Sequence, residues 1–175
     1  MTPLPNRVLR TLRAIPDYPK PGILFQDITP VLREATLLGE VIDHMCQPFR
    51  NAGVTHVLGI EARGFILGGA VATTLRAGFA PARKPGKLPW ERTTQSYDLE
   101  YGSDSLEAHR DAVRTGDRVL VVDDVLATGG TARAAGQLVR MLGAELVGWS
   151  FLLEIEGLGG RERLSDAVAH VVASC

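Results

Sequence analysis

The stretch "RVLVVDDVLATGGTARAA", Arg118 to Ala135, carries the clearest structural signal in the chain. An apolar run ends in two adjacent acids, Asp123 and Asp124, and a small glycine-rich turn follows before a helical pattern begins. A near-continuous apolar run is typical of a strand that is buried on both faces of a parallel sheet. The stretch therefore predicts a strand over 118–123, a turn, and a helix over 131–142.

The turn "ATGGT" has the features that a protein uses to bind a phosphate group. The two glycines allow positive φ and a close approach of the backbone, and the following helix presents its positive end to an anion. No lysine follows as it does in a Walker A loop, and the GxGxxG spacing of a dinucleotide site is absent. We predict that a phosphate is bound by Ala127, Thr128, Gly129, Gly130 and Thr131.

The two acids before the turn need a separate explanation, because a carboxylate repels phosphate. Carboxylates do accept hydrogen bonds from sugar hydroxyls. We interpret Asp123 and Asp124 as acceptors for the 2′ and 3′ hydroxyls of a ribose whose 5′-phosphate lies in the turn. They would also offset positive charge that develops on the sugar ring. The alternative is that the two acids only cap the start of the helix.

Strand and helix patterns alternate along the rest of the chain, which predicts an α/β protein with a mostly parallel sheet. Further strands are expected at 55–60, 79–83, 96–101, 145–155 and 168–173. Further helices are expected at 4–12, 34–51 and 64–78. An irregular segment with a short extended piece is expected at 18–32, and a polar, irregular segment at 84–96. Ligands of such sheets bind beyond the carboxyl ends of the strands. We therefore expect one site, built from the loops after Ile60, Arg83 and Val122.

Composition is that of an ordinary soluble globular protein of one domain, residues 1–175, with 45% hydrophobic and 22% charged residues. The net charge of −1 implies no sequence-independent attraction to nucleic acid or to an anionic membrane. No apolar run approaches the roughly 18 residues of a membrane span, and the N-terminus lacks the apolar core of a signal peptide. We therefore expect a cytoplasmic protein without a membrane or nucleic-acid partner.

The cysteines and histidines show no metal-binding pattern. Cys46 and Cys175 form no CxxC pair, which is typical of a reduced cytosolic protein. The four histidines have no ligand spacing, so we interpret them as structural or surface residues; they are His44, His56, His109 and His170.

The string "VLVVDDVLATGGTA" resembles the phosphoribosyl-pyrophosphate motif of the type I phosphoribosyltransferases. The segments "IPDYPKPGILFQDITPVL", "GIEARGF", "RKPGKLP", "SYDLEYG" and "LGGRERL" resemble, in order and spacing, the members that use adenine. The resemblance spans roughly Ile15 to Leu164. It implies the type I fold, a mostly parallel central sheet flanked by helices, with a small N-terminal hood over about residues 1–33. It also implies transfer of the phosphoribosyl group of 5-phosphoribosyl 1-pyrophosphate to adenine, giving AMP and pyrophosphate in purine salvage.

The resemblance further assigns roles to individual residues. Arg63 is expected to act in catalysis on the pyrophosphate, and a non-proline cis peptide is expected at Glu61–Ala62. The segment 82–102, "ARKPGKLPWERTTQSYDLEYG", is expected to form a lid over the reacting centre. Glu100 is the expected general acid/base, and Tyr101 is expected to position the substrate. The leaving pyrophosphate is expected to contact Arg63, Arg83, Lys84 and Lys87. Adenine is expected to be bound, largely through backbone groups, by Leu24, Phe25 and Gln26.

Taken alone, some of these residues also fit simpler explanations. Arg63 has the alternative of a surface ion pair, the lid that of a solvated loop, and Glu100 that of an ordinary acid at a strand end.

Further implications concern the cofactor and partners. Mg²⁺ is expected to arrive with the pyrophosphate substrate, and we name no protein residue as its ligand. A homodimer is implied. Two other functions remain open: a phosphoribosyltransferase for another base, such as guanine or hypoxanthine, and a regulator that senses the sugar phosphate and binds nucleic acid. The net charge and the chain length argue against the second.

Overall fold

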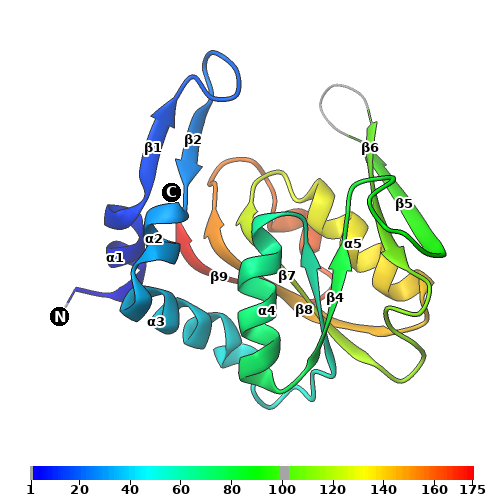
Figure 1. The fold of residues 1–175 in the computed structure, drawn as a ribbon. Helices are drawn as coiled ribbons and strands as arrows, with labels where there is room; N and C mark the ends of the chain where they lie inside the picture. Colours follow the sequence, from blue (N-terminus) through cyan, green and yellow to red (C-terminus); the bar gives the residue numbers. More distant parts are fainter. Residues whose placement is uncertain (1, 99–102) are drawn as a thin grey trace.

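The computed structural model describes residues 2–98 and 103–175. Its centre is a sheet of five parallel strands in the order β4-β3-β7-β8-β9 (Figure 1). This confirms the mostly parallel sheet predicted from the alternating pattern. The five strands are β3 (His56–Ile60), β4 (Gly78–Ala82), β7 (Arg118–Leu126), β8 (Glu145–Glu154) and β9 (Val168–Ser174).

Helices cover both faces of this sheet, which is why β7 is apolar at nearly every position. Leu120 and Val122 of β7 belong to the core cluster under the N-terminal helices, whereas Val119 and Val121 belong to the cluster under the last helix. Successive side chains of a strand point to opposite faces, so both sets are buried. The helices on the first face are α1 (Leu4–Thr11), α2 (Thr29–Arg33), α3 (Ala35–Cys46) and α4 (Arg63–Leu75). The helix on the second face is α5 (Gly130–Met141).

The strand order reverses between β3 and β7. After β3 the chain crosses through α4 to β4 on one side, and after β7 it crosses through α5 to β8 and then to β9 on the other. In open α/β sheets the crevice at such a switch point is where ligands bind. The residues that follow β3 and those at the end of β7 therefore meet at the place where a site is expected.

Two antiparallel hairpins stand on opposite flanks of the sheet (Figure 1). One pairs β1 (Arg13–Pro16) with β2 (Leu24–Asp27) in the N-terminal region. The other pairs β5 (Arg92–Asp98) with β6 (Ser103–His109) and packs on α5. The first hairpin carries the residues expected to bind adenine, and the second follows the loop that carries the expected pyrophosphate lysines.

Several elements differ in extent from those predicted. Strand β7 continues past residue 123 to Leu126, because Val125 and Leu126 still pair with β8. The predicted helix over 34–51 ends at Cys46 and continues as a short 3-10 turn that contains Pro48, a residue that cannot donate a helical hydrogen bond.

The two segments predicted to be largely irregular contain more regular structure than expected. In the segment 18–32, strand β2 agrees with the short extended piece predicted there, whereas helix α2, which begins at Thr29, was not predicted. The segment 84–96 becomes strand β5 from Arg92 onward, and the partner strand β6 was not predicted.

Candidate active site

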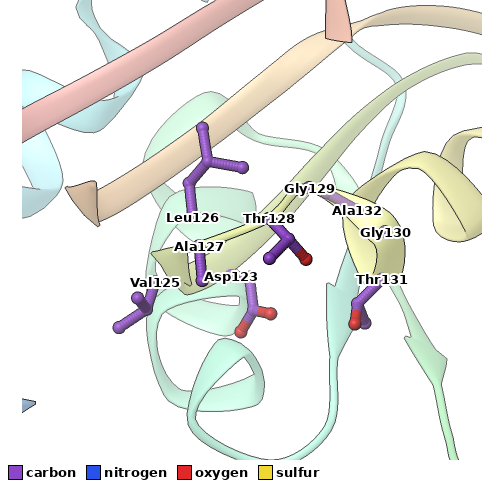
Figure 2. Close-up of a pocket in the computed structure, with 9 residues that line it drawn as sticks. All are labelled: Asp123, Val125, Leu126, Ala127, Thr128, Gly129, Gly130, Thr131 and Ala132. Carbon is purple, nitrogen blue, oxygen red and sulfur yellow. The ribbon is translucent and has the colours of Figure 1, made fainter. Parts of the chain in front are cut away.

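The turn between β7 and α5 encloses a small pocket (Figure 2). Figure 2 shows the carboxylate of Asp123 and the hydroxyl groups of Thr128 and Thr131 grouped beside the turn. The wall is completed by Val125, Leu126 and Ala132 and by the other predicted phosphate ligands, Ala127, Gly129 and Gly130. All five residues predicted to bind the 5′-phosphate therefore lie together at the positive end of α5, where backbone amides favour an anion.

Gly129 sets the shape of this turn. It immediately precedes α5 with φ of 79°, a left-handed conformation that favours glycine. A Cβ at this position would lie 2.7 Å from the carbonyl oxygen of Gly160. Gly160 belongs to the "LGGRERL" segment, and its own Cβ would lie 2.2 Å from the carbonyl oxygen of Ala127. The turn and this distant segment therefore pack backbone against backbone.

The acid pair lies inside β7, shortly before the phosphate turn, and Asp123 itself lines the pocket. Asp124 is only 4% exposed, and its amide donates to Asp123 Oδ1 at 2.8 Å. Burial and the neighbouring charge of Asp124 raise the pKa of Asp123 well above its ordinary value. The prediction that both acids stand at the strand's end is thus slightly wrong: the strand passes through them, and its pairing to β8 at Asp123 and Phe151 fixes their position.

Arg63 links the acid pair to the N-terminal hairpin. It is the first residue of α4, directly after the Glu61–Ala62 peptide, which is cis as expected. Its Nε donates to Asp124 Oδ2 in a short ion pair, and its guanidinium lies 5.5 Å from the ring centroid of Phe25 in the N-terminal hairpin. Arg63 does form an ion pair, but within the site and with a residue predicted to hold the ribose.

The start of α4 approaches β7 closely enough to require a glycine after Arg63. A Cβ on Gly64 would lie 2.8 Å from Asp123 Oδ1 and 2.9 Å from the carbonyl oxygen of Val122. The strand and the helix therefore hold Arg63 and the acids at a fixed separation. This is the close approach expected at the switch point between β3 and β7.

Glu61, which was not predicted as a site residue, pairs with two of the residues expected to bind pyrophosphate. Arg83 Nε donates to Glu61 Oε2 at 2.9 Å, and Lys87 Nζ forms a short ion pair with Oε1. Burial opposes ionisation of Glu61, but the hydrogen bonds from Lys87, from Arg83 and from the Lys84 amide outweigh it and lower the pKa of this carboxyl. The cationic loop is thereby tied to the residue that follows β3.

Lys84, the remaining expected pyrophosphate ligand, points instead into the second hairpin. Its Nζ forms a short ion pair with Asp104 and donates to the hydroxyl of Tyr97 at 2.9 Å. The hairpin also shapes the loop through Glu107, which is 5% exposed and accepts from the Gly86 amide at 3.0 Å. The structure thus places the three loop cations around carboxylates at the edge of the site.

The residues predicted to bind adenine lie on β2. Leu24 is 57% exposed, whereas Phe25 and Gln26 are half-buried. Tyr18 packs edge-on against Phe25, with ring centroids 5.1 Å apart. Phe25 of this hairpin lies beside the guanidinium of Arg63, which also pairs with Asp124. Arg63 therefore contacts both the predicted adenine region and the acid pair.

Two predicted site residues, Glu100 and Tyr101, lie outside the described residues. Among residues 2–98 and 103–175 there is no group of three histidine, cysteine or acidic side chains arranged to hold a metal ion. The histidines occupy other places: His44 and His170 hydrogen-bond each other at 3.1 Å, and His109 lies against Trp90. Within the same described part, no helix is long and apolar enough to cross a membrane.

Comparison with known proteins identifies the family of this chain. Residues 33–171 match the family model described as phosphoribosyl transferase domain. The adenine phosphoribosyltransferase of Myxococcus xanthus is 61% identical over 153 residues, covering 87% of this chain and 83% of the relative. The chain belongs to the adenine phosphoribosyltransferases.

Solved structures of adenine phosphoribosyltransferases have the same fold. The enzyme from Rhodothermus marinus superposes with a TM-score of 0.95 at 50% identity and covers 98% of both chains. The enzyme from Saccharomyces cerevisiae was solved with adenine and an imino-altritol bisphosphate, and it superposes with a TM-score of 0.89 at 38% identity. It covers 97% of this chain and 98% of its own. The type I phosphoribosyltransferase fold is therefore confirmed.

Replacing Glu61 by glutamine in this phosphoribosyltransferase is expected to lower the free energy of unfolding at pH 7 by about 1–2 kcal/mol, because charged hydrogen bonds to Arg83 and Lys87 weaken. The folded pKa of Glu61 lies below its unfolded value. Its stabilisation is therefore present above the unfolded pKa, roughly 4.3, and is lost as the pH falls through the folded pKa. Urea unfolding at pH 7, about 4 and about 3 measures this, since the stabilisation is lost only below the unfolded pKa of about 4.3.

The matched control for this variant is Glu91→Gln, which changes an exposed acid that pairs with Arg110. Its effect is expected to stay within about 0.5 kcal/mol. Equal stability of the Glu61 variant and the wild type at pH 7 would contradict the prediction, and so would a difference that does not shrink as the pH falls.

Proposed function

We propose that this chain transfers the phosphoribosyl group of 5-phosphoribosyl 1-pyrophosphate to adenine, releasing pyrophosphate and forming AMP for purine salvage. The observation that carries the proposal is an acid pair that lines the phosphate turn through Asp123 and pairs with Arg63 through Asp124, while the nearby Glu61 holds two loop cations. The relatives that share the fold are named for this reaction.

The substrate is proposed to lie along the switch point of the sheet. The 5′-phosphate would accept hydrogen bonds from the turn that ends in Thr131, and the ribose hydroxyls would donate to Asp123 and Asp124. The pyrophosphate would extend toward Arg63 and the loop cations, whose guanidinium and ammonium groups suit phosphate oxygens. In this arrangement Arg63 must exchange Asp124 for a phosphate partner, which the 41% exposure of its side chain permits.

The reaction forms one bond at the anomeric carbon and breaks another. A nitrogen of adenine supplies the electron pair, the bond from the anomeric carbon to the pyrophosphate oxygen breaks, and that oxygen keeps its electrons. The sugar carries oxocarbenium character in between, as in glycoside chemistry. The buried carboxylates stabilise this positive charge, and the cations stabilise the leaving group. Glu100 is the proposed acceptor of the proton that adenine gives up, with Tyr101 as a positioning partner.

Adenine is proposed to lie against β2, with Leu24, Phe25 and Gln26 around the base. Phe25 packs beside Arg63, so a base held there lies next to the acid pair. Mg²⁺ is proposed to enter as part of the substrate, bound to pyrophosphate and ribose oxygens, because Mg²⁺ keeps several waters and takes few protein ligands at such sites. We further propose that the enzyme is a cytoplasmic homodimer whose segment 82–102 acts as a lid.

The test of the proposed function is a panel of bases. The protein is mixed with 5-phosphoribosyl 1-pyrophosphate and Mg²⁺, and adenine, hypoxanthine, guanine, xanthine, uracil or orotate is added separately. Nucleotide formation is then followed by chromatography. We expect AMP from adenine and no product from the other bases, because a site that pairs the exocyclic amine rejects its absence strongly.

Each alternative result would show which part of the proposal is wrong. A product from hypoxanthine or guanine would keep the reaction but overturn the assignment of adenine to β2. No product from any base, with the sugar pyrophosphate still bound in calorimetry, would overturn the enzymatic function and favour a sensor of the sugar phosphate. Omitting Mg²⁺ in a parallel sample is expected to abolish product formation.

A further inference from the structure

A polar cluster centred on Tyr97 links the second hairpin to the site, and Tyr97 itself has no role in the reaction above. Lys84 Nζ donates to the Tyr97 hydroxyl at 2.9 Å, and Thr131 Oγ1 donates to it at 3.2 Å. The hydroxyl itself donates to Asp104 Oδ2 at 3.2 Å. The hydrogen-bonding capacity of the phenol is therefore fully used.

The two side chains that donate to this hydroxyl are proposed to bind opposite ends of the substrate. Thr131 belongs to the first turn of α5, where the 5′-phosphate is proposed to bind. Lys84 follows β4 and is proposed to meet the pyrophosphate. One side chain on β5 thus contacts a proposed ligand of each phosphate group.

The cluster is also suited to keep Lys84 charged and oriented. Its ammonium forms an ion pair with Asp104 and lies 5.5 Å from the ring centroid of Tyr97, within cation–π range. Burial opposes the charged form, but the hydrogen bonds from Lys84 to Asp104 and Tyr97 outweigh it and raise the pKa of Lys84. The lysine is half-exposed, so it remains accessible to a phosphate while its orientation is restricted.

We propose that Tyr97 is a positioning residue, whose hydroxyl aligns Thr131 and Lys84 so that one 5-phosphoribosyl 1-pyrophosphate molecule is bound at both its phosphate ends together. This inference rests on the proposed function and adds to it a residue that touches neither adenine nor the reacting carbon. Tyr97 acts through its two neighbours. Its removal should therefore affect the affinity for the sugar pyrophosphate and leave adenine binding unchanged.

The test is Tyr97→Phe, which keeps the ring, its packing and its cation–π contact but removes the hydroxyl. We expect KM for 5-phosphoribosyl 1-pyrophosphate to rise on the order of tenfold, with kcat and KM for adenine within about twofold of wild type and with the thermal midpoint unchanged. Calorimetry of the sugar pyrophosphate with each protein, in Mg²⁺ and without adenine, is expected to show the same loss of affinity.

A double-mutant comparison distinguishes positioning from simple support of the hairpin. In a Thr131→Val Lys84→Met background, both proposed ligands are already absent. Tyr97→Phe should then change the affinity less than about twofold, since residues that act through one another are not additive. Ser103→Ala, a substitution at an exposed position of the partner strand β6, is the control and should leave all constants unchanged.

Three results would overturn the inference: an unchanged KM in Tyr97→Phe, a tenfold rise that persists in the double-mutant background, or a lowered thermal midpoint with all kinetic constants altered together. An inactive wild type would instead refute the proposed function. In that case the calorimetry with the sugar pyrophosphate alone still decides whether Tyr97 aligns the two phosphate ligands.

Discussion

Replacing Asp124 by asparagine is expected to lower kcat/KM for 5-phosphoribosyl 1-pyrophosphate about 100-fold, because a charged hydrogen bond to the ribose is lost. Asp124 is 4% exposed, so water replaces the lost interaction poorly. The substitution keeps the size of the side chain and leaves an oxygen that still accepts from Arg63 Nε. We therefore expect a folded protein whose KM for adenine is nearly unchanged, measured by steady-state kinetics with each substrate varied in turn.

The same variant should change the dependence of kcat/KM on pH. Asp123 must be ionised to accept from the ribose, so wild-type activity falls as the pH falls through the pKa of Asp123. That pKa is raised by burial and by the charge of Asp124. Asparagine removes the second cause, so the pKa of Asp123 falls and the acid limb of the profile should move to lower pH.

The matched control is Asp43→Asn, the same chemical change at an acid whose side chain is 70% exposed and pairs with Arg50. Its kinetics should equal those of the wild type. Wild-type kinetics in Asp124→Asn would remove Asp124 from the ribose site. An acid limb that stays in place would remove the electrostatic coupling between the two acids.

The sequence was sufficient to predict the elements that carry the ribose and the phosphate. Strand β7 is apolar because helices cover both faces of the sheet, and such a run is distinctive. The turn is distinctive because only glycine fits at position 129. The order of the strands was not predictable in the same way, since it depends on which distant segments pair, and no local pattern records that pairing.

The residues that the sequence did not reveal share one property: their role depends on a partner far along the chain. Glu61 reads as an ordinary acid at a strand end until Arg83 and Lys87 are brought beside it. Glu107 lies in a polar stretch that gives little strand signal, yet pairing with the loop at Arg83 buries it. Alternation along 96–101 was visible, but nothing in it indicated that Tyr97 contacts Thr131 across the site.

The same dependence on distant partners applies to the loop cations, whose carboxylate partners were not predicted from the sequence. Their charge predicts an anion, and in the structure each pairs with a carboxylate of the protein: Arg83 and Lys87 with Glu61, and Lys84 with Asp104. A substrate phosphate must compete with these carboxylates. Carboxylates of the protein therefore orient the loop cations. In the proposed reaction, the incoming pyrophosphate would replace these carboxylates as the partner of the cations.

Replacing Gly129 by alanine is expected to lower kcat/KM for 5-phosphoribosyl 1-pyrophosphate about 100-fold, since a displacement of about 1 Å in a positioning element can cost that much. The φ of 79° costs a non-glycine residue about 1–2 kcal/mol, and the new Cβ would lie 2.7 Å from the backbone oxygen of Gly160. A backbone atom cannot turn aside as a flexible side chain can. The turn must therefore shift, and with it the amides that would bind the 5′-phosphate.

Stability should fall together with activity in this variant, by about 2–3 kcal/mol, which lowers the thermal midpoint by roughly 5–10 °C. Gly39→Ala is the matched control: Gly39 lies in α3, nothing is within 4 Å of its added Cβ, and alanine there should be neutral or stabilising by up to about 1 kcal/mol. Scanning calorimetry and kinetics on both variants separate the two effects. If Gly129→Ala lost stability but kept its affinity for the sugar pyrophosphate, the turn would be a structural junction with Gly160 and the 5′-phosphate would bind elsewhere. If it lost both, the conformation of this one glycine would be what couples the packing of the "LGGRERL" segment to substrate binding.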